Sequence, residues 1–133
     1  MKSKKIKRVI RLEDIPEWAS YGSRKPDDPT RWKTLVSEEA NGSKDLWFGL
    51  ARLLPGEVHL LHYHKRETEI YYVVQGRAKI TIDSEEIDTT PGTTIYIEPG
   101  TKHEVVNNGQ EPLLFLCIFN FPSISSSEWC TRY

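Results

Sequence analysis

Apolar and polar side chains alternate with a period of two residues over most of the chain after residue 45. The segment 77–83 shows the pattern clearly, because Ala78, Ile80 and Ile82 would share one face of a strand and its polar residues the other. Successive side chains of a β-strand point to opposite faces, so this period predicts strands, and no stretch shows helical periodicity of comparable strength. The predicted strands are 46–54, 57–64, 69–74, 77–83, 94–98, 103–107 and 113–121.

These short strands follow one another at near-regular spacing with Gly-containing turns between them, which predicts an all-β sandwich or barrel. The segment 113–121 is apolar on both faces, and we therefore expect it to be covered on both sides. One face would line the barrel. The other face would contact either the N-terminal segment or a second subunit. If it contacts a second subunit, we expect a homodimer.

The first 45 residues have no regular pattern. Residues 8–15 are compatible with a short strand that Pro16 would limit, and residues 21–30 have the Gly, Pro and Asp content of a loop. The length of 133 residues is typical of one domain. We expect a single domain that consists of an N-terminal strand and loop extension packing on the barrel (1–45), the barrel (46–122) and a C-terminal tail (123–133).

Charge and composition exclude several classes of partner. The chain has 18 Lys and Arg against 19 Asp and Glu, so nothing suggests a nucleic-acid or membrane partner. The basic segment 1–11 is not followed by the apolar core of a signal peptide, and no apolar run reaches the length of a transmembrane helix. Cys117 and Cys130 do not make a disulfide framework, so we expect a cytoplasmic protein in which Cys117 packs as a small apolar residue.

Candidate chemistry is concentrated in one strand pair. Three of the four histidines lie within residues 59–64, and Glu69 follows after a short polar loop. His62 and His64 share a face of the strand. If the loop 65–68 closes a hairpin, His64 lies opposite Glu69 and His62 opposite Tyr71, and all four side chains point to one side. Two solvent-facing histidines would give the same H-x-H pattern, so the glutamate at hairpin spacing makes a metal site the better interpretation.

At these positions the sequence resembles the cupin superfamily. The first cupin motif is a glycine, five residues, H-x-H, three or four residues, a glutamate, six residues and a glycine. Residues Gly56, His62, His64, Glu69 and Gly76 match it at every fixed position.

The second cupin motif is a glycine, five residues, P-x-G, two residues, a histidine, three residues and an asparagine. Gly92, Gly100, His103 and Asn107 match it, and Glu98 replaces its proline. The resemblance implies a cupin double-stranded β-barrel of jelly-roll type. It also implies one divalent transition metal ion, bound by His62, His64, Glu69 and His103. Three imidazoles and a carboxylate suit Fe, Mn, Ni, Zn, Co or Cu.

A narrower similarity concerns the cupin-type lyases that cleave dimethylsulfoniopropionate. Those enzymes share an R-W-K stretch, here Arg31-Trp32-Lys33, and a tyrosine two residues after the ligand glutamate, here Tyr71. In that family the tyrosine is thought to take a proton from a metal-bound carboxylate substrate. The family's second tyrosine has no clear match, since Trp129 and Tyr133 occupy that region.

The resemblance leaves three functions open. The first is a metal-dependent lyase or isomerase that acts by proton abstraction on a small metal-bound carboxylate, with Tyr71 as the catalytic residue. Tyr71 could instead be an interior aromatic residue that only packs. The second is an Fe- or Ni-dependent dioxygenase, and the third a non-catalytic cupin that binds a small ligand.

Residues outside the motifs complete the expected site. His59 has the opposite parity to His62 and is expected to point out of the barrel. Glu67 is a reserve candidate for a metal ligand, and Trp32 and Trp47 are candidates for pocket walls. The candidate anchors for a carboxylate substrate are Arg31, Lys33 and Arg52.

Overall fold

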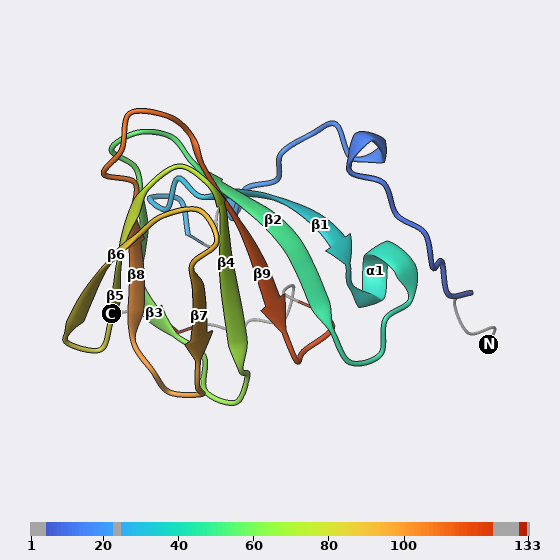
Figure 1. Cartoon of the computed structure of the whole chain (residues 1–133). Coiled ribbons are helices and arrows are strands. Elements are labelled where there is room, and N and C mark those ends of the chain that lie inside the picture. The colour runs from blue at the N-terminus through green and yellow to red at the C-terminus, as the bar shows by residue number, and fades with distance from the viewer. Residues whose placement is uncertain (1–4, 23–24, 124–130, 133) are drawn as a thin grey trace.

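The structure, a computed structural model, describes residues 5–22, 25–123 and 131–132. Two five-stranded sheets form the walls of a β-barrel (Figure 1), and the strand pairings within each sheet are antiparallel. The first has the order β1-β2-β9-β4-β7 and the second β10-β3-β8-β5-β6. The strands are β1 (Arg31–Val36), β2 (Trp47–Leu53), β3 (Val58–Tyr63), β4 (Glu69–Gln75), β5 (Ala78–Ile82), β6 (Glu85–Thr89), β7 (Thr94–Ile97), β8 (His103–Val106), β9 (Leu113–Phe119) and β10 (Thr131–Arg132).

This architecture confirms the all-β barrel and each of the seven predicted strands. Three further strands of the described chain, β1, β6 and β10, were not predicted. β6 lies at the edge of its sheet and pairs only with β5, and its sequence EEIDT is too polar to show an apolar alternation. In the region of the expected tail, β10 pairs with β3.

The strand predicted at 8–15 is wrong. A three-residue 3₁₀ helix, η1 (Leu12–Asp14), occupies the segment, and the side chain of Val9 is 60% exposed. An alternation of apolar residues does not produce a strand where no neighbouring surface buries the apolar side chains. The only α-helix described, α1 (Glu38–Asn41), is a single turn between β1 and β2 that ends at Gly42.

The core consists of the inward-facing residues of both sheets. Burial alternates along the whole of β9, where Phe115 and Cys117 face the interior and Leu114 and Leu116 the outside. The outward-facing residues of β9 are half-buried in the single chain. The homodimer that this second apolar face suggests therefore stays a prediction. No helix among the described residues is long and apolar enough to cross a membrane.

The residues of the two motifs lie at strand ends. Glu69 is the first residue of β4, His103 the first of β8, and His64 directly follows β3. Side chains at such positions reach the barrel interior while the adjoining loops remain adjustable. The fold therefore brings chemistry from two sequence segments to one end of the core.

Asn107 holds the loops at the other end of β8 together. Its side-chain nitrogen donates to the carbonyl oxygens of Leu53 (2.9 Å) and Glu111 (3.0 Å), and its side-chain oxygen accepts from Gly109 N (2.9 Å). The residue is almost fully buried. The asparagine of the second motif thus has a structural role, which is to join three loops.

We expect Asn107→Asp to lower the free energy of unfolding by about 3 kcal/mol, because a carboxylate oxygen would face two buried carbonyl oxygens. Asn108→Asp is the matched control, since that neighbouring side chain is exposed, and it should change the free energy by less than about 0.5 kcal/mol. Chemical denaturation of both variants measures the difference. Equal stability of the two would show that the Asn107 bonds contribute nothing.

Candidate metal centre

The four side chains of the cupin motifs meet inside the barrel. His62 belongs to β3, His64 follows it, Glu69 begins β4 and His103 begins β8. All four are buried, and one potential ligand atom from each lies within 4.8 Å of those of the others. The structure therefore groups the four residues that the cupin resemblance selects, in a cluster that can hold a metal ion.

The route by which they meet differs from the predicted hairpin. β3 and β4 do not pair, because β3 belongs to the sheet with β8 and β4 to the sheet with β7 and β9. His62 lies opposite His103, and Glu69 lies opposite Ile97 and Phe119. The loop 65–68 thus crosses from one sheet to the other, and the cluster forms between the sheets.

Backbone groups orient the imidazoles. Nδ1 of His62 donates to the carbonyl oxygen of Leu60 (2.6 Å), and Nδ1 of His103 donates to that of Thr101 (2.8 Å). A carbonyl oxygen can only accept, so both rings carry the proton on Nδ1 and leave Nε2 for a cation. The amide of Gly100 also donates to the carbonyl oxygen of His64 (2.7 Å), which ties the two motifs together.

The glutamate is the electrostatic centre of the cluster. Its Oε1 lies 3.1 Å from His103 Nε2 and 3.4 Å from His64 Nε2, and neither contact has hydrogen-bond geometry. Burial would raise the pKa of Glu69, but the imidazoles of His103 and His64 outweigh burial and lower the pKa to about 2. Converging buried polar atoms without hydrogen bonds to one another are the arrangement that a cation would satisfy.

The protonation states also suit a metal. Burial, with smaller contributions from His103 and His59, holds the pKa of His62 well below its ordinary value. His62 is therefore neutral and Glu69 ionised at neutral pH, which are the forms that bind a metal. Three nitrogen donors and one carboxylate oxygen suit divalent transition metals of intermediate softness. These residues are therefore compatible with the ion that the resemblance implies.

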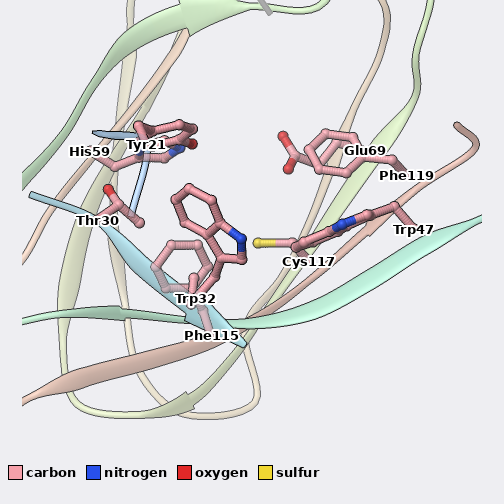
Figure 2. A pocket seen from close by; sticks show the side chains of 10 residues that line it. Tyr21, Thr30, Trp32, Trp47, His59, Glu69, Phe115, Cys117 and Phe119 are labelled. Carbon is pink, nitrogen blue, oxygen red and sulfur yellow. The ribbon is translucent and has the colours of Figure 1, made fainter. Parts of the chain in front are cut away.

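A cavity adjoins the cluster. It lies between the two sheets and opens toward solvent. In Figure 2, Tyr21, Thr30 and His59 lie at one side and Glu69 at the other, with Trp32 and Cys117 between them. The lining consists of Tyr21, Thr30, Trp32, Trp47, Ala51, His59, Glu69, Phe115, Cys117 and Phe119.

Trp32 and Trp47, for which core packing was the favoured alternative, belong to the core and also line the cavity. Cys117 is buried, as predicted, and its sulfur lies near Trp32 in Figure 2. Burial, with a smaller contribution from the charge of Glu69, raises the pKa of the Cys117 thiol well above its ordinary value. The thiol therefore stays protonated.

The prediction that His59 points outward is wrong. The residue is 6% exposed and lines the cavity, because the β3–β8 register shifts between His59 and His62 and breaks the parity. Its Nδ1 lies 3.0 Å from Oδ2 of Asp28, a residue that the sequence did not single out. An acidic residue in a Pro-rich loop carries no signal of such a contact.

The predicted carboxylate anchors lie elsewhere. Lys33 and Arg52 stack on Trp18, and the guanidinium of Arg31 donates to the carbonyl oxygens of Pro29 and Thr30. None of the three lines the cavity. Lys25 is buried, lies over the ring of Tyr21, and contributes to the lowered pKa of His59 and His62.

Tyr71 faces the interior, as predicted, and Tyr72 the outside. The Tyr71 ring packs against His103 (5.8 Å between centroids) and Phe115 (5.0 Å). It is fully buried and is not part of the described cavity lining. Glu67 is buried but lies outside the cluster. Cys130, Trp129 and Tyr133 lie outside the described residues.

We expect Glu69→Gln to weaken metal binding by more than about tenfold, since even the loss of a residue behind a ligand has that effect. Glu67→Gln is the matched control, because it changes a buried glutamate two residues away, and it should retain the metal. Elemental analysis after dialysis against a chelator measures both. If Glu69→Gln retained the metal and Glu67→Gln lost it, Glu67 would be the metal ligand in place of Glu69.

Comparison with known proteins gives a family and several relatives. Residues 49–119 match the cupin domain family. An uncharacterized protein of Methanocaldococcus jannaschii is 41% identical over 73 residues, which are 55% of this chain and 58% of that protein. The chain thus spans less than two thirds of this relative.

Two further relatives bear functional names. A glucose-6-phosphate isomerase of Thermococcus onnurineus is 30% identical over 130 residues, covering 85% of this chain and 69% of that enzyme. A Thermotoga maritima structure described as a predicted oxalate decarboxylase is 28% identical, with a TM-score of 0.73, over 86% of this chain and 99% of that one.

Proposed function

This chain belongs to the cupin family, and we propose that it is a metal-dependent isomerase that moves a proton beside the carbonyl group of a small hydroxylated substrate. The observation that carries the proposal is the cavity. It joins a metal-capable cluster to hydrogen-bonding groups on Tyr21, Thr30 and His59, and no Lys or Arg is among the described residues that line it. Such a wall suits a neutral hydroxyl-bearing substrate segment.

The same lining supports an isomerase more than a lyase that acts on a carboxylate. A carboxylate in a dry pocket needs a counter-charge or paired donors, and the predicted anchors Arg31, Lys33 and Arg52 point elsewhere. The Thermotoga relative is named for a carboxylate substrate, whereas the Thermococcus relative is named for a sugar phosphate. We favour the sugar-type substrate, whose hydroxyl groups Tyr21, Thr30 and His59 can bind.

The residues divide the work of the proposed reaction. His62, His64, Glu69 and His103 would hold the ion, which when bound supplies a Lewis acid for a substrate oxygen. Trp32 and Trp47 line the cavity and would cover an apolar part of the substrate. We propose Tyr71 as the residue that takes and returns the proton, since it packs against His103 from the interior face of β4.

The first test is the reaction itself. Protein loaded with Fe, Mn, Ni, Co or Zn should interconvert glucose 6-phosphate and fructose 6-phosphate, and Glu69→Gln should lower the rate more than tenfold. Rates should be equal with and without oxygen. No interconversion with any of these metals would contradict the proposal for this substrate, and oxygen-dependent turnover would instead support the dioxygenase.

The second test concerns the proton-transfer residue. Tyr71→Phe should reduce kcat by about 100-fold or more while the metal content stays normal, because it removes only the hydroxyl. Tyr72→Phe is the matched control, as Tyr72 is the neighbouring, outward-facing tyrosine and 44% exposed. If both variants keep the normal kcat, Tyr71 is a packing residue.

A further inference from the structure

Asp28 and His59 form a buried polar pair in the wall of the cavity. Asp28 belongs to the loop before β1, and His59 belongs to β3. Only about 4% of Asp28 and 6% of His59 is exposed. The pair lies outside the metal cluster, and neither the cupin motifs nor the proposed reaction assigns it a role.

Hydrogen bonds define the direction of the Asp28–His59 contact. Oδ1 of Asp28 accepts from Thr30 N (3.0 Å) and Thr30 Oγ1 (2.6 Å), and Oδ2 accepts from Leu60 N (3.1 Å). Both carboxylate oxygens are thus acceptors already. The Nδ1 of His59, 3.0 Å from Oδ2, must therefore donate, and the neutral ring has its lone pair on Nε2.

The charge states agree with this geometry. Burial would raise the pKa of Asp28, but the hydrogen bond and charge of His59 outweigh it and hold the pKa well below the ordinary range. Burial also lowers the pKa of His59, against the opposing effect of Asp28. Asp28 is therefore an anion at neutral pH, which is the form that accepts all of these hydrogen bonds.

The position of His59 links the pair to the metal cluster. Its ring centroid lies 4.4 Å from that of His62, and its plane is nearly parallel to that of Tyr21 at 6.0 Å. Nδ1 of His59 bonds to the carboxylate of Asp28. Nε2 of His59 has no hydrogen-bond partner within the described part of the chain. Because His59 lines the cavity, this acceptor is available to a ligand there.

We propose that Asp28 and His59 are a substrate-binding pair, in which Asp28 fixes the ring so that Nε2 of His59 accepts a hydrogen bond from a hydroxyl group of the substrate. The hydroxyl-bearing substrate class rests on the proposed function. The metal cluster and His59 would then hold two separate points of one small molecule, and the aromatic side chains of the cavity would cover the part between them.

A purely structural role is the competing explanation. Leu60 lies where the β3–β8 pairing is irregular, and Asp28 accepts the hydrogen bond of its amide, so Asp28 also supports the strand. A structural pair would affect stability but not ligand affinity at normal metal content. A third role, as an additional metal ligand, would make the metal content depend on His59.

The first measurement tests the pair without any ligand. Long-range ¹H–¹⁵N NMR of the zinc-loaded protein should show the His59 ring protonated on Nδ1 and not on Nε2. Asp28→Asn should alter this signal, and Asp27→Asn should not, because Asp27 is the neighbouring exposed aspartate. A His59 ring that carries its proton on Nε2 in the unchanged protein overturns the proposal.

The second measurement uses sorbitol 6-phosphate, a polyol that cannot be isomerised, as the probe. Its binding to zinc-loaded protein can be followed by the fluorescence of Trp32 and Trp47, which line the cavity. His59→Leu and Asp28→Asn should weaken binding by about threefold to tenfold, as expected for one lost hydrogen bond. His59→Gln should restore part of the affinity, since its amide oxygen can accept a hydrogen bond, and Asp27→Asn should bind normally.

The outcomes separate this inference from the proposed function. Normal affinity in His59→Leu, with full metal content, overturns the inference even if the protein isomerises sugar phosphates. Weakened binding in a protein that isomerises none of them supports the pair and contradicts the isomerase. Loss of metal in both His59→Leu and His59→Gln would show that His59 is a metal ligand. Absence of probe binding to the unchanged protein would contradict the substrate class. Either result overturns the inference. If His59→Leu does not fold, His59→Gln and Asp28→Asn decide.

Discussion

A carboxylate buried inside a β-barrel is the constraint on which the rest of this structure depends. Glu69 is 2% exposed, and an isolated anion at that depth would cost several kcal/mol. Imidazoles from β3, β8 and the loop between the sheets surround it, and carbonyl groups of Leu60 and Thr101 fix two of these rings. The bond from Gly100 to His64 holds the two sequence motifs in contact. The strand ends and the turns that carry these residues place three imidazoles around one carboxylate.

The alternation of apolar residues was sufficient to predict the strands and their faces, because burial and backbone period act on the same residues in β5 and β9. It was insufficient for the pairing. A loop of four residues fits a hairpin and a crossing between sheets equally well, and only the competition of all strands for partners placed β3 beside β8. The polar edge strand β6 is stabilised by its pairing with β5, which leaves no mark in its own sequence.

The candidate site divides in the same way. His62, His64, Glu69 and His103 could be selected from spacing, since the motif fixes their positions relative to the turns. The inward direction of His59 could not be predicted from spacing. It depends on a register shift in β3 and on the hydrogen bond from the amide of Leu60 to Asp28. The anchors proposed from charge alone do not line the cavity, and Arg52 and Lys33 lie over the ring of Trp18 instead.

The protonated state of Cys117 has a consequence for the choice of metal. A thiolate beside three imidazoles would create a soft ligand environment and attract monovalent copper. With its sulfur kept as an uncharged thiol by burial and by the adjacent Glu69, the interior offers only nitrogen and oxygen donors. An uncharged thiol is a weaker metal ligand than a thiolate, and it is also a poor nucleophile toward peroxides and electrophiles.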